Sequence, residues 1–124
     1  MQVMASRSLV VKVTAGMDDP ERCNQAFTVA AAAAASGVPV SLWLTGEAAW
    51  FALPGRAEAL ALPYATPLAE LLATIMKSGT VSLCTQCASR REITADDTIQ
   101  GVRIAGAAAF VAEIMAEGAQ ALVY

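Results

Sequence analysis

The sequence predicts an α/β fold in which helices cover both faces of a parallel sheet. Short apolar segments, several of them rich in valine, alternate with helical segments five times along the 124 residues, which is the pattern of strand–helix–strand units. The chain contains neither an internal repeat nor a low-complexity linker. A chain of this length and pattern is expected to form one domain, residues 1–124, with a buried core.

The first strand and the first helix carry the clearest local signals. Residues 9–14 are mostly β-branched and apolar, as expected of a buried strand. Asp19 and Pro20 then supply a helix N-cap and a first-turn proline. The helix should extend from Pro20 to about Ser36, and Gly37 should end it.

The middle of the chain contains two further strands. They are expected over 38–44 and 80–83. Between them we expect a short helix over 47–53, an irregular segment over 56–64, and a longer helix that Thr66 and Pro67 begin and Gly79 ends. The apolar stripe of that longer helix consists of Leu68, Leu71, Leu72, Ile75 and Met76.

The last third of the chain follows the same alternation. We expect a short capped helix from Thr94, a brief strand over 102–105, a helix over 107–117 and a final strand over 121–124. The helix over 107–117 should be buried through Phe110, Val111, Ile114 and Met115.

The composition favours a soluble protein that hides apolar surface in subunit contacts. Hydrophobic residues make up 56% of the chain and charged residues 15%, which is more apolar than an average soluble domain. The alternative is a membrane protein. However, Gly37 and Pro39 interrupt the longest uncharged stretch, 26–44, so it is too short for a bilayer-spanning helix, which needs about 20 continuous residues.

The distribution of charge argues against a nucleic-acid partner and favours a cytoplasmic location. The formal net charge is −3 and no basic face is visible, so a nucleic-acid partner is not expected. Lys12 interrupts the first apolar run, which makes a poor signal peptide. We therefore expect a cytoplasmic protein, whose cysteines are more typical of redox, sulfur or metal chemistry than of structural disulfides.

The strongest candidate for chemistry is the segment 80–91, where two cysteines precede two arginines. Cys84 directly follows the third strand, and ligands of parallel sheets gather at the carboxyl ends of strands. If a helical turn begins near Thr85, its free N–H groups point toward the Cys84 sulfur, while Arg90 and Arg91 add positive charge. Both effects lower a thiol pKa. The alternative is a small buried core cysteine.

Cys87 has three interpretations. With Cys84 it forms a Cys-x-x-Cys pair suited to disulfide chemistry, it can contribute to a metal site, or it can fill space. A metal is not expected, because Cys23 is the only other thiol and the chain has no histidine. The absence of histidine also excludes Cys–His and Ser–His–Asp catalysis within the chain. Cys23 itself is expected to pack in the core.

Other candidates carry weaker signals. Thr85 is expected to line the pocket beside Cys84. Gly16 and Met17 follow the first strand and are expected either to line the same pocket or to form a simple turn. They show no dinucleotide-binding or phosphate-loop pattern, and no cofactor is expected. Trp50 and Phe51 are expected in the core or at an interface. Glu47 is expected to be a solvated charge, with an arginine contact as the alternative.

The order of these elements resembles the DsrE/DsrF/TusD-like, or YchN-like, sulfur-relay family. The similarity rests on Cys84 followed by Arg90-Arg91, and it extends over nearly the whole chain. It includes the small-residue helix segment 26–35, the segment 37–40, and the segment 104–107 before the terminal strand.

The resemblance implies a three-layer α/β/α sandwich around a five-stranded sheet, and assembly as a trimer or hexamer. It also implies that Cys84 carries sulfane sulfur as a persulfide and transfers it to a partner. Arg90 would then stabilise the thiolate, the persulfide anion or an anionic donor such as thiosulfate or polysulfide.

Two departures from the family pattern leave alternatives open. Glu92 stands where a glycine often follows the second arginine, which is expected to affect the local turn. Cys87 stands where a small residue such as alanine is common, so it can attack a Cys84 persulfide, release sulfide and leave a disulfide. A thiol–disulfide redox protein and a non-catalytic subunit of a sulfur-transfer assembly are therefore the alternative functions.

Overall fold

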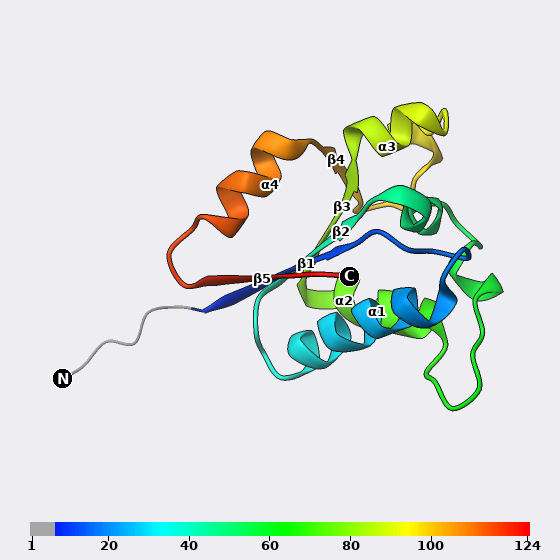
Figure 1. The fold of residues 1–124 in the computed structure, drawn as a ribbon, viewed down its shortest axis with the longest axis horizontal. Helices are drawn as coiled ribbons and strands as arrows, with labels where there is room; N and C mark the ends of the chain where they lie inside the picture. Colours follow the sequence, from blue (N-terminus) through cyan, green and yellow to red (C-terminus); the bar gives the residue numbers. More distant parts are fainter. Residues whose placement is uncertain (1–6) are drawn as a thin grey trace.

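The computed structural model describes residues 7–124, so residues 1–6 of the expected domain lie outside the described part. Within it, five strands form one parallel sheet in the order β4-β3-β2-β1-β5 (Figure 1). The strands are β1 (Ser8–Val13), β2 (Val40–Leu44), β3 (Thr80–Cys84), β4 (Arg103–Ala105) and β5 (Ala119–Val123).

Helices cover both faces of the sheet. The α-helices are α1 (Pro20–Ala35), α2 (Leu68–Ser78), α3 (Thr85–Arg90) and α4 (Ala107–Ile114), and the 3-10 segments are η1 (Gly46–Ala52), η2 (Ala57–Ala59) and η3 (Ala95–Asp97). Figure 1 shows α1 and α2 on one side of the sheet and α3 and α4 on the other. The predicted three-layer α/β/α fold is therefore confirmed.

Strand alternation divides the sheet into an apolar face and a more polar face. Val11, Leu42 and Leu83 are fully buried in the main core, which lies on the side of α1 and α2. Their neighbours Lys12 and Trp43, paired in register, point to the opposite side. The second face is the one that α3 and α4 cover.

Helix α1 follows its sequence signals closely. The Asp19 side chain accepts a hydrogen bond from the Arg22 backbone N–H, and Pro20 is the first helical residue. The small alanines of α1 let it pack closely against the sheet and α2, while Phe27 packs edge-on against Phe51 of η1 at 6.2 Å between ring centroids. Burying Phe27 completely stabilises the fold by roughly 2–3 kcal/mol.

Helix α2 begins one residue later than predicted. Pro67, rather than Thr66, occupies the N-cap position, because its ψ of 138° is extended. The carbonyl of Thr66 instead accepts a hydrogen bond from the Asn24 side chain of α1. Two elements differ in extent: α4, and the short helix η3, which was expected to continue to Gly101 and ends at Asp97. The other predicted boundaries agree with the structure within two residues.

Helix α4 differs most from its prediction. It ends at Ile114 instead of Glu117, and none of its eight residues is buried. Val111 and Met115, expected in the core, are 51% and 75% exposed. The prediction was wrong for these two residues because an apolar stripe indicates only that a helix needs a covering surface, and the sheet covers α4 on its Phe110 side alone. Within residues 7–124, no helix is both long and apolar enough to cross a membrane.

Candidate active site

A cavity of about 390 Å³ lies at the carboxyl ends of β1, β2 and β3, on the polar face of the sheet. The sheet and α3 form its floor and one wall, and the start of α4 forms the opposite wall. The lining residues are Lys12, Trp43, Thr45, Cys84, Thr85, Gln86, Gly106, Ala107 and Phe110. Its size falls within the range of small-molecule sites.

Cys84 is positioned by the junction of β3 and α3. It is the last residue of the strand and the N-cap of the six-residue helix, and it is partly exposed. Partial burial raises the pKa of its thiol. Four effects lower the pKa: hydrogen bonds from the Cys87 backbone, the Cys87 thiol and the Gln86 backbone, and the charge of Lys12. Together they outweigh burial and leave the pKa below its usual value of 9.0. Cys84 is thus a partly exposed thiol that ionises more readily than an ordinary cysteine.

Cys87 lies in the first turn of α3 and is only 8% exposed. Its sulfur accepts a hydrogen bond from the Gly46 N–H at 3.2 Å, and its own thiol donates to the Cys84 sulfur. Both cysteines are free thiols, and Cys87 is near enough to Cys84 to lower the pKa of its thiol. This arrangement allows Cys87 to stabilise the Cys84 thiolate, and also to react with a sulfur atom bound there.

Arg91 connects α3 to η1. Its guanidinium donates to a Glu47 carboxylate oxygen at 2.7 and 3.3 Å and to the Cys87 carbonyl at 3.2 Å, and it lies 5.9 Å from the Trp50 ring centroid. The sequence-based view of Glu47 as a solvated charge was therefore wrong. Arg90 is exposed on α3, and the cavity lining includes neither arginine.

Lys12 is the cation that lines the cavity, and the sequence analysis assigned it no role there. Its ammonium lies 5.2 Å from the centroid of the Phe110 ring of α4. The available signal was its position: the only charged residue of a mostly apolar strand, one residue before that strand's carboxyl end. The sequence analysis also missed four further lining residues: Trp43, Thr45, Gln86 and Phe110. Trp43 and Phe110 meet only because α4 crosses the sheet.

The other predicted lining residues separate into two groups. Thr85 lines the cavity beside Cys84. Gly16 instead packs against the backbone of Glu47, where a Cβ would approach the Glu47 carbonyl oxygen to 2.4 Å, and Met17 is 58% exposed. Gly16 thus permits the close approach of η1 to the end of β1, and η1 in turn receives Arg91.

The third cysteine is separate from this site. Cys23 is fully buried in the core, as predicted. Desolvation, with the nearby charges of Asp18 and Asp19, raises the pKa of its thiol to about 12. Cys23 is therefore unreactive near neutral pH. Within residues 7–124, no group of three or more side chains is arranged to hold a metal ion.

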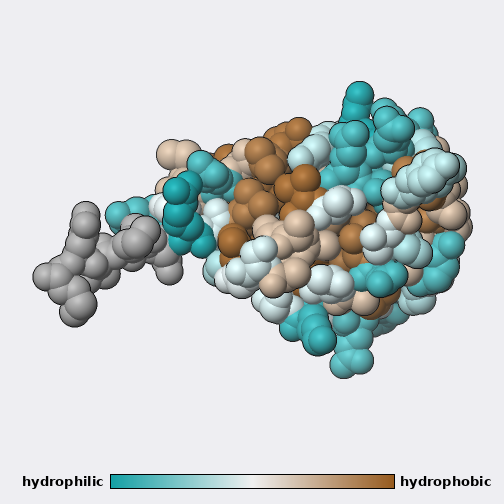
Figure 2. Space-filling view, turned by 90° about the horizontal axis from the view of Figure 1, so that it is seen from below, coloured by the Kyte–Doolittle hydropathy of each residue, from teal (hydrophilic) through white to brown (hydrophobic). Residues whose placement is uncertain are grey.

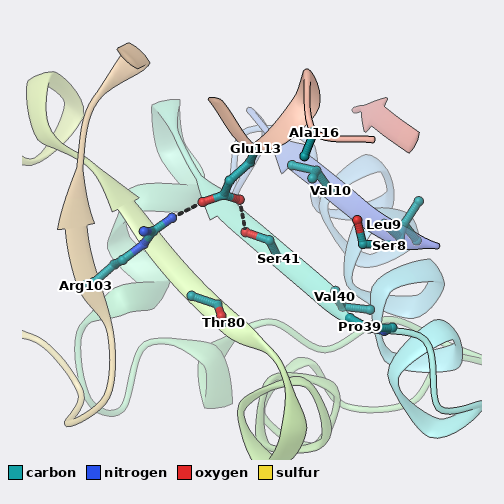
Figure 3. Close-up of a pocket in the computed structure, with 10 residues that line it drawn as sticks. All are labelled: Ser8, Leu9, Val10, Pro39, Val40, Ser41, Thr80, Arg103, Glu113 and Ala116. Atoms are coloured by element: carbon teal, nitrogen blue, oxygen red, sulfur yellow. Dashed lines mark hydrogen bonds and ion pairs between the residues drawn. The ribbon is translucent and has the colours of Figure 1, made fainter. Parts of the chain in front are cut away.

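A polar cluster fastens α4 to the same face of the sheet, beside a second cavity of about 290 Å³ (Figure 3). Glu113 reaches down from α4 to accept hydrogen bonds from the Ser41 hydroxyl at 2.5 Å and the Trp43 indole at 3.1 Å, and it pairs with Arg103. Burial raises the pKa of the Glu113 carboxyl. These hydrogen bonds and the Arg103 charge lower it by a larger amount, so the pKa lies below its usual value.

Exposed apolar residues concentrate on α4 and β5. Val111, Met115, Leu122 and Val123 are all between 39% and 75% exposed. Figure 2, which views the molecule from the side of α1 and α2, shows that hydrophobic residues also gather in a group on that face instead of being scattered among hydrophilic ones. Grouped apolar surface of this kind is typical of contact sites between proteins.

Comparison with known proteins gives a family and a fold. The sequence profile of the DsrE/DsrF-like family matches residues 7–124. Among solved structures, the YchN protein from E. coli is similar, with a TM-score of 0.78 and 18% identity over 95% of this chain and 99% of that chain. MTH1491 from Methanobacterium thermoautotrophicum has a TM-score of 0.72 and 11% identity, with the same coverage.

A third structure, BT1422 from Bacteroides thetaiotaomicron, has a TM-score of 0.62 and 15% identity over 99% of this chain and 100% of that chain. No curated protein matches the sequence. At these identities the structural similarities establish the fold alone, while the profile match covers the whole described part of the chain.

Proposed function

Because this chain belongs to the DsrE/DsrF-like family, we propose that it is a sulfur-relay protein in which Cys84 carries sulfane sulfur as a persulfide. The observation that carries this proposal is the place of Cys84: a partly exposed thiol with a lowered pKa at the wall of a 390 Å³ cavity. We place the protein in the cytoplasm, where donor and acceptor proteins or small sulfur species exchange sulfur with it.

The proposed reaction has two balanced steps. In loading, the Cys84 thiolate attacks the outer sulfur of a donor, a new S–S bond forms, the donor's S–S bond breaks, and the leaving group departs with the electron pair. In transfer, an acceptor thiolate attacks the outer sulfur of the protonated persulfide, so that the acceptor gains the S–H group and Cys84 returns to the thiolate. A lowered thiol pKa favours both the attack and the departure of Cys84.

The test is sulfur loading of the full chain by thiosulfate or polysulfide, followed by peptide mass measurement. Trypsin cleavage after Lys77 and Arg90 leaves both Cys84 and Cys87 in one peptide. Loading should therefore be compared in wild type, Cys87→Ser and Cys84→Ser. We expect a mass gain of one sulfur atom in the first two and none in Cys84→Ser. Equal gain in Cys84→Ser would remove Cys84 as the carrier.

A second candidate function is thiol–disulfide exchange, supported by the hydrogen bond between the two thiols. Here the Cys87 thiolate attacks the inner sulfur of the Cys84 persulfide, forms a Cys84–Cys87 disulfide and releases hydrosulfide; an external dithiol then reduces the disulfide. Its signature is a disulfide with a defined reduction potential that disappears in Cys87→Ser. If that variant changes neither sulfur loading nor redox titration, this alternative fails.

The arginines and the assembly complete the proposal. Arg91 holds the helix that carries both cysteines, while exposed Arg90 supplies positive charge where an anionic donor or acidic partner approaches. The apolar surface of α4 and β5 supports a homo-oligomer, a trimer or a hexamer. The third possibility, a non-catalytic subunit, would be favoured by a Cys84 sulfur buried away from any cavity. Its place in the cavity wall instead argues against that possibility.

A further inference from the structure

Lys12 is an uncommon residue for its position. Its neighbours in β1, Val11 and Val13, are both fully buried in the core, whereas Lys12 projects from the other face into the cavity. A cation held in a partly buried place costs solvation and side-chain entropy. This cost indicates that the charge serves a purpose in the cavity beyond packing against Phe110.

The cavity offers Lys12 no carboxylate. Among the described residues that line it, the polar ones are Thr45, Cys84, Thr85 and Gln86, and none is acidic. The nearest acidic residue along α4, Glu113, belongs to the neighbouring cavity and is held there by Arg103, Ser41 and Trp43. The cavity therefore combines one ammonium group, one reactive thiol and the apolar rings of Trp43 and Phe110.

The register places a gap between the ammonium and the thiol. Lys12 pairs with Trp43, and Trp43 pairs with Ser82, two residues before Cys84 on the same face. Lys12 and Cys84 are thus separated by two strand spacings across the sheet and by two residues along it, roughly 12 Å between their backbones. The flexible lysine side chain spans part of this distance, which leaves space for a short linear anion between the two groups.

We propose that Lys12 determines the donor class of this site by binding the charged end of a small dianionic sulfane-sulfur compound whose terminal sulfur then meets Cys84. This inference rests on the proposed persulfide function. Two sources share the chemistry: thiosulfate and a short inorganic polysulfide. In either case the donor enters as a free anion, not as a persulfide on a protein.

The reaction then balances in both atoms and charge. The Cys84 thiolate attacks the sulfane sulfur of thiosulfate, the S–S bond of thiosulfate breaks, and sulfite leaves with the electron pair. With polysulfide, the leaving group is the dianion shortened by one sulfur atom. The divalent leaving group develops its full charge at the Lys12 end of the cavity, so the ammonium stabilises departure as well as binding.

Anion recognition can be measured without any sulfur transfer. Iodoacetate and iodoacetamide alkylate the same thiol and differ in charge, so their rate ratio at Cys84 reports the local preference for anions. Because both reagents need the thiolate, a change in thiol pKa cancels in this ratio. We expect Lys12→Met to lower the iodoacetate-to-iodoacetamide ratio about tenfold at low ionic strength, and Lys12→Arg to preserve it. Lys77→Met, which removes an exposed lysine from α2, is the matched control and should leave the ratio unchanged.

Donor selection is then measured as the rate of sulfur loading on Cys84. Lys12→Met should load at least about tenfold more slowly than wild type at subsaturating anion, and sulfate should compete with loading in wild type but not in the variant. The anion whose rate falls more, thiosulfate or tetrasulfide, identifies the source.

The outcomes separate the two proposals. An unchanged alkylation ratio in Lys12→Met overturns the role of Lys12, whatever the loading result. A changed ratio with no sulfur loading in wild type by either anion overturns the donor assignment, while anion recognition by Lys12 stands; the persulfide function itself fails only if a protein persulfide does not load Cys84 either. Efficient loading from a protein persulfide that does not depend on Lys12 overturns the selection of a free anion.

Discussion

At the residue scale, the chemistry of Cys84 depends on its hydrogen-bond donors and on one distant charge. The backbone and thiol of Cys87, the Gln86 backbone and Lys12 together outweigh partial burial and lower the thiol pKa. A thiol pKa that is lower in the folded protein than in the unfolded chain contributes stability above the unfolded value. That contribution is lost as pH falls through the folded value. Thiolate chemistry and folding are thus coupled at this residue.

The Cys87 thiol is expected to have a measurable share in this effect. Cys87→Ala removes a donor to the Cys84 sulfur, so the pKa of Cys84 should rise toward 9.0, and alkylation by iodoacetamide at pH 7 should slow by roughly three- to tenfold. Cys87→Ser keeps a hydroxyl donor and should slow it less. Cys23, with a pKa of about 12, adds no background. An identical pH midpoint in the wild type and the alanine variant would contradict this assignment.

Glu92 shows the cost of a departure from the family pattern. Its φ of 56° lies in the left-handed region, which disfavours residues with a Cβ by about 1–2 kcal/mol. The turn after Arg91 is therefore retained with glutamate in a place suited to glycine. The turn at Glu92 affects the site because it ends α3 next to Arg91, the residue that anchors α3 to η1.

Replacing Glu92 by glycine should stabilise the protein. The side chain is exposed, so little packing is lost, and we expect Glu92→Gly to raise the free energy of unfolding by about 1 kcal/mol after the greater flexibility of glycine in the unfolded chain is included. Urea denaturation measures the change. Glu92→Ala, which keeps the Cβ, is the control and should show no comparable gain; equal stability of the two variants would refute the strain.

At the scale of elements, α4 forms one wall of the reactive cavity but is held weakly. None of its residues is buried, and its attachment to the sheet consists mainly of Phe110, which packs edge-on against Trp43 at 5.3 Å between centroids, and the Glu113 cluster. Since Gly106, Ala107 and Phe110 line the cavity, any movement of α4 changes access to Cys84. The hydrogen bonds of Glu113 in the neighbouring cavity therefore affect access to Cys84, because they hold α4 in place.

Loss of the Glu113 carboxylate should loosen α4. Glu113→Ala removes its hydrogen bonds to Ser41 and Trp43 and its pairing with Arg103, which should cost about 1–2 kcal/mol. Amide exchange in residues 107–114 should accelerate about tenfold, and Cys84 should become more accessible to iodoacetamide. Glu117→Ala, at an exposed position, is the matched control.

The same cluster predicts a pH effect of known sign. Because the carboxyl pKa of Glu113 is lower in the folded protein, its contribution is fully present above the ordinary value of 4.5 and is lost as pH falls through the lower folded value. Acid should therefore loosen α4 in wild type but not in the alanine variant. Exchange rates in 107–114 that do not depend on Glu113 at any pH would contradict both statements.

At the scale of the whole molecule, the apolar composition is only partly used inside one chain. Side chains of α4 and β5 remain exposed, although the fold is complete and α1 and α2 cover the opposite face (Figure 1). A second copy is the simplest cover for such a surface. The homo-oligomer proposed above would also shield the outer side of the helix that forms the cavity wall.

Charges on this surface should prevent assembly. We expect wild type to sediment as a trimer or hexamer, and the double variant Met115→Glu/Val123→Glu to sediment as a smaller species, because two buried charges outweigh the apolar contact. Tyr64→Glu, which changes a fully exposed aromatic residue elsewhere, should leave the assembly intact. Sedimentation velocity measures the size; a monomeric wild type would rule out the proposed oligomer.

The local order of the chain determined most of the fold. Valine-rich runs, the Asp19–Pro20 helix start, the Thr94–Asp97 capping box and the glycines that end helices are short-range signals, and the structure contains the elements that they predict. The position of Cys84 at the end of β3 was also visible, because it depends on a strand boundary and on parallel topology. Family membership followed from the same linear order.

Only the tertiary structure decided which groups surround that cysteine. Lys12 and Phe110 are 98 positions apart by their numbers, 110 − 12, yet their side chains meet over the cavity, whereas Arg91, seven positions from Cys84 (91 − 84), turns to Glu47. Sequence distance does not report the direction in which a side chain leaves its helix or strand, and α4 crosses the sheet as its few contacts allow. The physical reason is that electrostatics and burial depend on distances in space, which only packing determines.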